Sequence, residues 1–159
     1  MDIETLSRQK VTQEGPARIR PRMLERIEHI ALAVDDLEAA ISHYRDVWGV
    51  EAVHREIVEE QGVEEVMLPV GDTFLQLLGA TGSDTIIGRF LERRGEGLHH
   101  IAYEVDDLEG AIADLQTKGV TVIDETPRQG GRDQLVAFVD PKSNHGLLVE
   151  LIQRPMPTV

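Results

Sequence analysis

The sequence of 159 residues has no cysteine, few aromatic residues and no long apolar run. Without cysteine, disulfides and thiolate metal ligands are excluded, so a bound metal must be held by imidazole, carboxylate, amide or water. No segment approaches the roughly 20 apolar residues that a membrane-spanning helix needs, and the N-terminus lacks an apolar signal-peptide core. We therefore expect a cytoplasmic protein with no membrane partner.

Basic residues are also scarce. The chain has 16 lysines and arginines against 29 aspartates and glutamates, which gives a net charge of −13. Nucleic-acid-binding proteins present basic surface to phosphate, so this balance argues against a nucleic-acid partner. An anionic substrate would need a locally basic site. The hydrophobic fraction of 41% is enough to form a core.

An internal repeat organises the sequence. Residues 29–41, HIALAVDDLEAAI, align with residues 100–112, HIAYEVDDLEGAI, at a separation of 71 residues with ten identities in thirteen positions. Near the end of each half, FLQLL (74–78) aligns with LVELI (148–152), which makes Gln76 equivalent to Glu150. We therefore expect two copies of one structural unit.

The same order of elements is predicted for both halves. An alternating strand is followed by a helix, with an aspartate at its start and a glycine at its end, and then by three more strands. The fold class is therefore α+β, with two tandem βαβββ modules, each with its helix outside, facing each other across a cleft. The expected strands are 27–34, 50–58, 63–70 and 73–79, then 98–105, 120–126, 134–139 and 146–153.

The domain boundaries follow from the repeat. A segment between the halves has apolar residues at helical spacing and indicates a linker helix, and both chain ends lie outside the repeat. The expected organisation is an N-terminal extension (1–25), a first module (26–82), a linker helix (83–96), a second module (97–153) and a C-terminal tail (154–159).

Four polar residues are expected to converge. His29 and His100 are repeat equivalents on the strand face that carries alanines, and Gln76 and Glu150 are equivalents on the last strand of each half. Pseudo-twofold symmetry would bring two nitrogens and two oxygens together, a donor set for cobalt, nickel, manganese, iron or zinc. The alternative is a set of hydrogen-bonded polar residues in a half-buried cleft. His99 falls on the helix-facing side of its strand and is interpreted as structural.

These residues lie in stretches that resemble the vicinal oxygen chelate superfamily, which includes glyoxalase I and the extradiol dioxygenases. Residues 27–153 most resemble its methylmalonyl-CoA epimerase family. The matching stretches are IEHIALAV, EEQGV, FLQLL, GLHHIAYEVDDL and DPKSNHGLLVEL. Asp140, where we expect histidine in this family, and residues 129–134 depart from the pattern.

The resemblance implies a function and a set of site residues. It implies that His29, Gln76, His100 and Glu150 are metal ligands, with Co²⁺ the first candidate. It also implies that Glu60 and Glu150 are the two bases that epimerise (2R)/(2S)-methylmalonyl-CoA through a metal-stabilised enolate. The expected partners are an acyl-CoA substrate and a second copy of the chain in a homodimer. From the residues alone, Glu60 belongs to an ordinary solvated acidic loop.

Three alternatives use the same scaffold. A glyoxalase-type isomerase is expected to carry glutamate where Gln76 stands, and an amide cannot remove a proton. An Fe(II) extradiol-type dioxygenase would use His29, His100 and Glu150 as a facial triad. A non-catalytic protein that binds a small ligand in the cleft would need neither a metal nor Glu60.

Overall fold

The computed structural model describes residues 22–155, and these form two similar halves. The tail from residue 156 and most of the expected N-terminal extension, residues 1–21, lie outside the described part. The first half contains β1 (Arg26–Ala33), α2 (Leu37–Trp48), β2 (His54–Val58), β3 (Val63–Val70) and β4 (Thr73–Ala80). The helix α3 (Ile86–Arg94) follows it. The second half contains β5 (Gly97–Val105), α4 (Leu108–Thr117), β6 (Arg128–Gln129), β7 (Leu135–Val139) and β8 (Val149–Gln153).

The helices begin and end where the sequence predicts. The Asp36 carboxylate accepts a hydrogen bond from the Ala39 amide at 2.9 Å, and Asp107 accepts one from Gly110 at 3.0 Å. Such N-caps satisfy amides that have no partner within the helix. Gly49 ends α2 with φ 68°, in the left-handed region that glycine adopts without steric strain.

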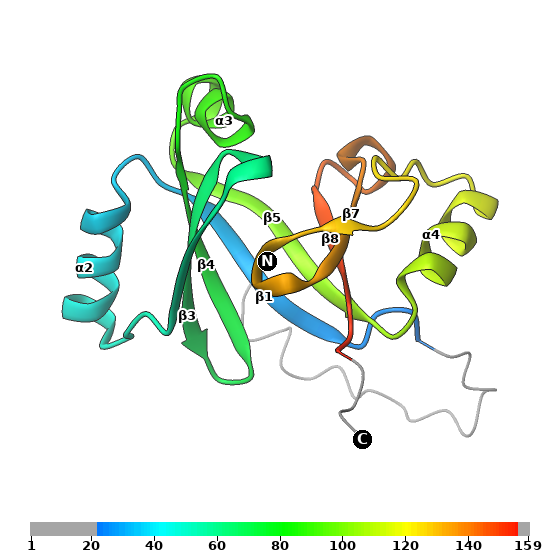
Figure 1. The fold of residues 1–159 in the computed structure, drawn as a ribbon, viewed down its shortest axis with the longest axis horizontal. Helices are drawn as coiled ribbons and strands as arrows, with labels where there is room; N and C mark the ends of the chain where they lie inside the picture. Colours follow the sequence, from blue (N-terminus) through cyan, green and yellow to red (C-terminus); the bar gives the residue numbers. More distant parts are fainter. Residues whose placement is uncertain (1–21, 156–159) are drawn as a thin grey trace, which may run out of the picture.

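The two halves share one sheet, so the two modules that were expected to face each other are joined through their central strands. Its strand order is β2-β3-β4-β1-β5-β8-β7-β6. β1 and β5 pair antiparallel at the centre, β1 pairs parallel with β4, and β5 pairs parallel with β8. Figure 1 shows this sheet curling, with α2 and α4 at opposite ends of the molecule. The inner face of the curl is where the predicted cleft lies.

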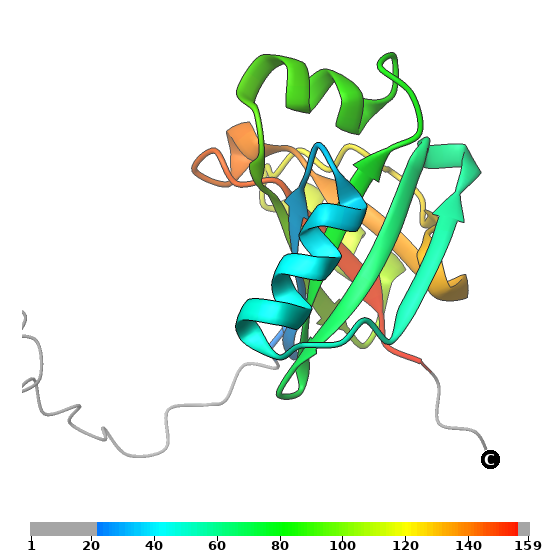
Figure 2. The same cartoon turned by 90° about the vertical axis from the view of Figure 1, so that its left-hand side faces the viewer.

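Each outer helix packs on the aliphatic face of its half. Leu32 and Val34 lie with Leu37 of α2 in one hydrophobic cluster, as the strand alternation predicts. Ala31 and Ala33 lie on the other face, in a cluster with Ile87 of α3. α3 therefore covers part of the inner side of the sheet, and Figure 2 shows it above the strands. None of the helices within residues 22–155 is both long and apolar enough to cross a membrane.

The second half departs from the prediction at residues 120–126. Only one isolated bridge, Val122 with Val139, forms there, and the strand β6 begins two residues after that segment ends. Pro127 has no amide hydrogen to donate to a ladder, and the residue before a proline is restricted as well. The short 3-10 turn Gly131–Asp133 then leads into β7 and lies against the first half of the chain, because the Arg132 amide donates to Glu56 at 2.5 Å.

Candidate metal centre and cleft

The strand pairing places the four predicted ligands around two alanines of the central strands. Both alanines are fully buried, and their small side chains leave room on the inner face of the sheet. Across the ladders, Ala31 lies opposite His100 and Gln76, and Ala102 lies opposite His29 and Glu150. The repeat therefore gives each ligand the same local setting as its equivalent.

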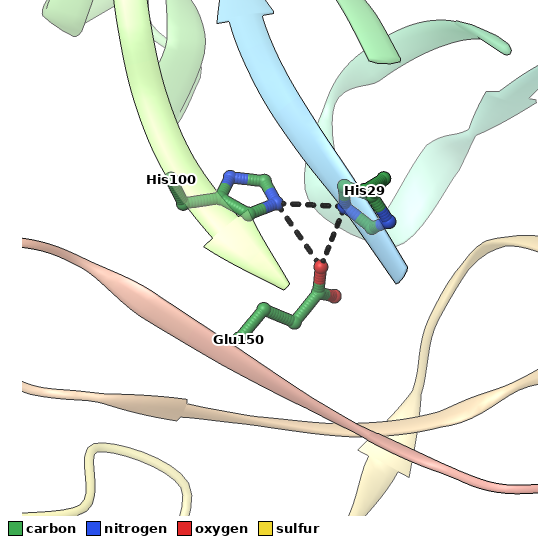
Figure 3. A group of neighbouring side chains, drawn as sticks. All are labelled: His29, His100 and Glu150. Atoms are coloured by element: carbon green, nitrogen blue, oxygen red, sulfur yellow. Dashed lines mark hydrogen bonds and ion pairs between the residues drawn. The ribbon is translucent and has the colours of Figure 1, made fainter. Parts of the chain in front are cut away.

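Three donor atoms from this set meet at one point (Figure 3). The His29 Nε2 atom lies 3.1 Å from Glu150 Oε2 and 3.1 Å from His100 Nε2. The remaining pair, His100 Nε2 and Glu150 Oε2, is 3.0 Å apart. These distances are shorter than twice the roughly 2.1 Å bond that a divalent ion makes to such atoms, so one ion can contact all three. The three side chains could hold a metal ion.

Gln76, the fourth predicted ligand, lines the same cavity as the other three residues. Its Nε2 atom donates to Glu65 at 2.9 Å. Its Oε1 atom is buried and accepts no hydrogen bond from any of residues 22–155. An unpaired buried amide oxygen is unfavourable unless it meets a cation or a donor. Two imidazoles, one carboxylate and one free amide oxygen therefore fit a divalent metal.

The charges of the cluster are interdependent. Burial alone would lower the pKa of His29, but the Glu150 and Glu28 carboxylates beside it raise that pKa to about 9. Burial would likewise raise the pKa of Glu150, yet the His100 and His29 imidazoles hold the Glu150 pKa well below its usual range. In the absence of a metal, a proton shared with these imidazoles therefore balances the buried carboxylate.

A cavity opens beside this cluster and contains a second buried carboxylate. Its volume is about 900 Å³ when the open mouth is included. Glu65 of β3 and Glu150 of β8 both line it, so each half contributes one carboxylate. Burial first, and then the neighbouring Glu56 carboxylate, raises the pKa of Glu65 to about 7. Its Oε1 atom has no hydrogen-bond partner among the described residues.

Comparison with known proteins agrees with this geometry. Residues 28–138 match the family model of the Glyoxalase/Bleomycin resistance protein/Dioxygenase superfamily. The methylmalonyl-CoA epimerase of Mus musculus is 39% identical over 131 residues, which cover 82% of this chain and 74% of the mouse protein. The chain belongs to the methylmalonyl-CoA epimerase family of this superfamily.

Other members of the epimerase family extend the comparison. The ethylmalonyl-CoA/methylmalonyl-CoA epimerase of Cereibacter sphaeroides is 37% identical over 133 residues, covering 82% of this chain and 99% of that protein. A variant of the Streptomyces coelicolor methylmalonyl-CoA epimerase, solved in complex with 2-nitronate-propionyl-CoA, superposes with a TM-score of 0.78 at 42% identity. That match covers 82% of this chain and 94% of the Streptomyces chain.

Within this epimerase-family fold, Glu60 does not join the cluster. Glu60 is exposed in the 3-10 turn Glu59–Gln61 and does not line the cavity, whereas its neighbour Gln61 does. The polypeptide enters β3 at Val63, and strand alternation then makes Val63 and Glu65 line the cavity. The position of Glu60 before the strand therefore leaves it outside, and Glu65 is the site residue that the sequence analysis missed.

Two further site residues were also missed or misread. Glu28 is only 2% exposed and contacts His29, although adjacent residues of a regular strand point to opposite faces. His99 lines the cavity, with its Nδ1 atom 2.9 Å from His100 Nδ1, so the expectation that its side chain points away from the cleft was wrong. In both places a β-bulge interrupts the alternation on which the prediction depended.

Proposed function

We propose that this protein is a metal-dependent epimerase that inverts C2 of methylmalonyl-CoA. The observation that supports this best is the pair of buried carboxylates, Glu65 and Glu150, which come from different halves and line one cavity. Inversion requires a proton to leave one face of the carbon and to return on the other, so it needs two such groups. The relatives named above carry methylmalonyl-CoA in their names.

The metal would be held by His29, His100, Glu150 and the Gln76 amide oxygen, with Co²⁺ our first candidate. When bound, it supplies Lewis-acid stabilisation of the negative charge that develops on the thioester oxygen, a contribution of several kcal/mol. All four of these residues line the cavity in which the substrate would bind. Neutral imidazole and carboxylate donors also suit Ni²⁺, Mn²⁺, Zn²⁺ and Fe²⁺.

We assign Glu65 the role that the resemblance gave to Glu60, the base on one face of the substrate carbon. A pKa of about 7 leaves this carboxyl group partly ionised and partly protonated at neutral pH. A group in that range can both remove and return a proton, and such catalysis contributes about 10²–10⁴-fold. The Gln76 amide that donates to Glu65 Oε2 keeps the carboxylate oriented in the cavity.

Glu150 is the base for the opposite face in this proposal. It lies on β8 in the second half, so the substrate carbon can be held between the two carboxylates. The substrate itself is anionic, and two cationic side chains, Arg128 and Arg132, line the cavity of this otherwise acidic protein. They provide the local positive charge that the sequence composition requires for an acyl-CoA partner.

The test follows hydrogen exchange at C2. The Co²⁺-loaded protein is incubated with one epimer of methylmalonyl-CoA in deuterated water and observed by NMR. We expect metal-dependent entry of deuterium together with loss of optical purity. Absence of metal-dependent exchange would refute the proposal, and oxygen consumption in the ferrous form would then favour the dioxygenase alternative.

A further inference from the structure

Two buried polar residues that the proposed reaction does not use lie next to the candidate ligands. Glu28 precedes His29 and His99 precedes His100, so the two pairs are repeat equivalents 71 residues apart. Glu28 is 2% exposed, and His99 is half-buried on the cavity wall. A deeply buried carboxylate such as Glu28 needs a partner, and both Glu28 and His99 contact the histidine that follows them.

A β-bulge accounts for both contacts. In the β1–β5 ladder, Ile27 pairs with Tyr103 and His29 with Ala102, so Glu28 is an extra residue on β1. Bulges leave one residue unpaired, bend the strand locally and redirect side chains. This is how the Glu28 side chain comes to lie beside the ring of its own neighbour.

The second bulge lies at the equivalent place on β5. Ala31 pairs with His100 and Leu32 with Leu98, so His99 is the extra residue. The ring of His99 also packs edge-to-face against Phe90 of α3, with the centroids 4.9 Å apart. The repeat has therefore placed an irregularity of the same kind before each candidate ligand histidine.

The contacts of Glu28 indicate which ring nitrogen of His29 is available to bind a metal. A Glu28 oxygen accepts a hydrogen bond from His29 Nδ1–H, since a carboxylate can only accept. Nε2, which faces Glu150, is therefore the nitrogen that can bind a metal once its own proton is released. The other Glu28 oxygen accepts from Arg132 Nη2 at 2.7 Å. Arg132 has a φ of 51°, which is unusual for a residue with a side chain. The hydrogen bond that its backbone amide donates to the Glu56 carboxylate helps to hold it in this conformation.

We propose that Glu28, anchored by Arg132, and His99 are positioning residues that set the tautomers of His29 and His100 for metal binding. This inference rests on the metal centre of the proposed function. In this proposal His100 donates its Nδ1–H to the Nδ1 atom of His99, 2.9 Å away. Both ligand rings then bind the metal through Nε2, on the side of Glu150, after the proton shared with that carboxylate is released. Outer contacts of this kind fix the orientation and raise the basicity of metal-bound histidines.

The two outer contacts are chemically unequal. The charged Glu28 carboxylate polarises its imidazole more strongly than the neutral His99 ring does, because charge-assisted hydrogen bonds are about twice as strong as neutral ones. We therefore expect His29 to bind the metal more strongly than His100 does. Loss of Glu28 should weaken metal binding more than loss of His99.

Metal affinity is the first test, measured for Co²⁺ by competition with a chromophoric chelator in the absence of substrate. We expect Glu28→Ala to weaken binding about 10–100-fold and to alter the visible Co²⁺ spectrum. Glu28→Gln, which keeps an accepting oxygen but loses the charge, should recover part of this loss. The matched control is Glu104→Gln, because Glu104 is a buried carboxylate on β5 that pairs with Arg26 and, within residues 22–155, forms no hydrogen bond or ion pair with a histidine.

The second test observes the tautomers directly. In the Zn²⁺-loaded protein with ¹⁵N-labelled histidine, long-range proton–nitrogen correlations should show His29 and His100 with hydrogen on Nδ1. That proton should be shifted downfield and slow to exchange, because it is hydrogen-bonded to Glu28 or His99. His99→Phe should lose this signature at His100, whereas His99→Asn, whose side-chain oxygen can accept in place of Nδ1, should retain it. Circular dichroism checks that each variant is folded.

The outcomes separate this inference from the proposed function. Metal affinity and spectra that are unchanged in Glu28→Ala and His99→Phe would overturn the positioning role, even in an active epimerase. Affinity losses in a protein that does not epimerise methylmalonyl-CoA would support the positioning role and refute the function. A wild-type protein that binds neither Co²⁺ nor Zn²⁺ would overturn the inference.

Discussion

At the scale of single residues, Glu65 is the side chain on which the proposed chemistry depends most. Replacing it with glutamine removes the base and retains the shape and a hydrogen-bonding group. We expect Glu65→Gln to lower kcat about 10²–10⁴-fold with a much smaller change in KM. Steady-state epimerisation assays measure both constants.

Glu60→Gln is the matched control for this substitution. The residue lies five positions earlier in the chain, is exposed, and does not line the cavity. We expect its kcat to stay within about twofold of wild type, since surface changes away from a site have small effects. A large loss in Glu60→Gln together with an active Glu65→Gln would restore the original assignment of Glu60 as the base.

The metal ligands predicted from the sequence lie at equivalent positions of the internal repeat. His29 and His100 share one alignment position and Gln76 and Glu150 another, so symmetry alone predicted that they meet. Glu65 has no such mark, because it stands among other glutamates and only its inward register on β3 separates it from them.

At the scale of elements, the turn Gly131–Asp133 of the second half packs against Glu56 and Glu65 of the first half. A Cβ atom at Gly131 would overlap the carboxylate of Glu65. The Glu65 carboxylate is the mobile end of a side chain, so Gly131→Ala should displace the base without unfolding the protein. We expect kcat to fall at least about tenfold, which corresponds to 1.4 kcal/mol, while the melting temperature changes little.

Gly79→Ala is the control for this turn. A Cβ atom there would meet the Leu37 side chain at 3.4 Å, on the outer side of the sheet. We expect near-normal kcat from this variant. Equal loss of activity in both glycine variants would show that the effect is general and not due to Glu65.

The helix caps give a prediction about stability alone. Asp36→Ala removes the side-chain oxygen that accepts from the Ala39 amide at the start of α2. We expect the free energy of unfolding to fall by about 0.5–2 kcal/mol, because an amide of the first helical turn loses its capping partner. Denaturant unfolding measures the loss, and kcat should not change because α2 lies outside the cleft.

Elements were predicted well where local signals are strong and poorly where the backbone is irregular. The capping aspartates and the terminal glycines located α2 and α4, and alternation located β1 and β5. The bulges at Glu28 and His99 were not predictable, since each shifts the alternation by one residue and leaves no distinctive residue type. The absence of a strand at 120–126 has a visible cause in Pro127, which donates no amide hydrogen to a ladder and restricts the residue before it.

At the scale of the whole molecule, the metal-free protein should become less stable as the pH rises from 6.5 to 9. Burial opposes the charge on His29, but Glu150 and Glu28 raise its pKa to about 9 from an ordinary 6.5. In this window the folded protein keeps a proton that the unfolded chain has released, so stability is present below pH 6.5 and lost toward pH 9. The loss is up to about 3 kcal/mol.

Urea unfolding of EDTA-treated protein at a series of pH values measures this change. The matched comparison is the Zn²⁺-loaded protein, in which His29 binds the ion in place of the proton, so the decline should disappear. Stability of the metal-free protein that is constant or rises between pH 6.5 and 9 would contradict the ionisation described for His29. The homodimer and the cytoplasmic location remain predictions from the sequence.

The pairing of β1 with β5 also bears on how such a protein can arise. Each half contributes one imidazole and one oxygen to the cluster, so a single unit holds only half of a binding site. An ancestor with one unit could complete four donors only by associating with a second copy of itself. Duplication and fusion of its gene would make that association permanent and free the two copies to diverge. The two halves now carry different residues at two equivalent positions, with Gln76 in place of Glu150 and Glu28 in place of His99. These differences make the site asymmetric although the sheet around it is built from a repeat.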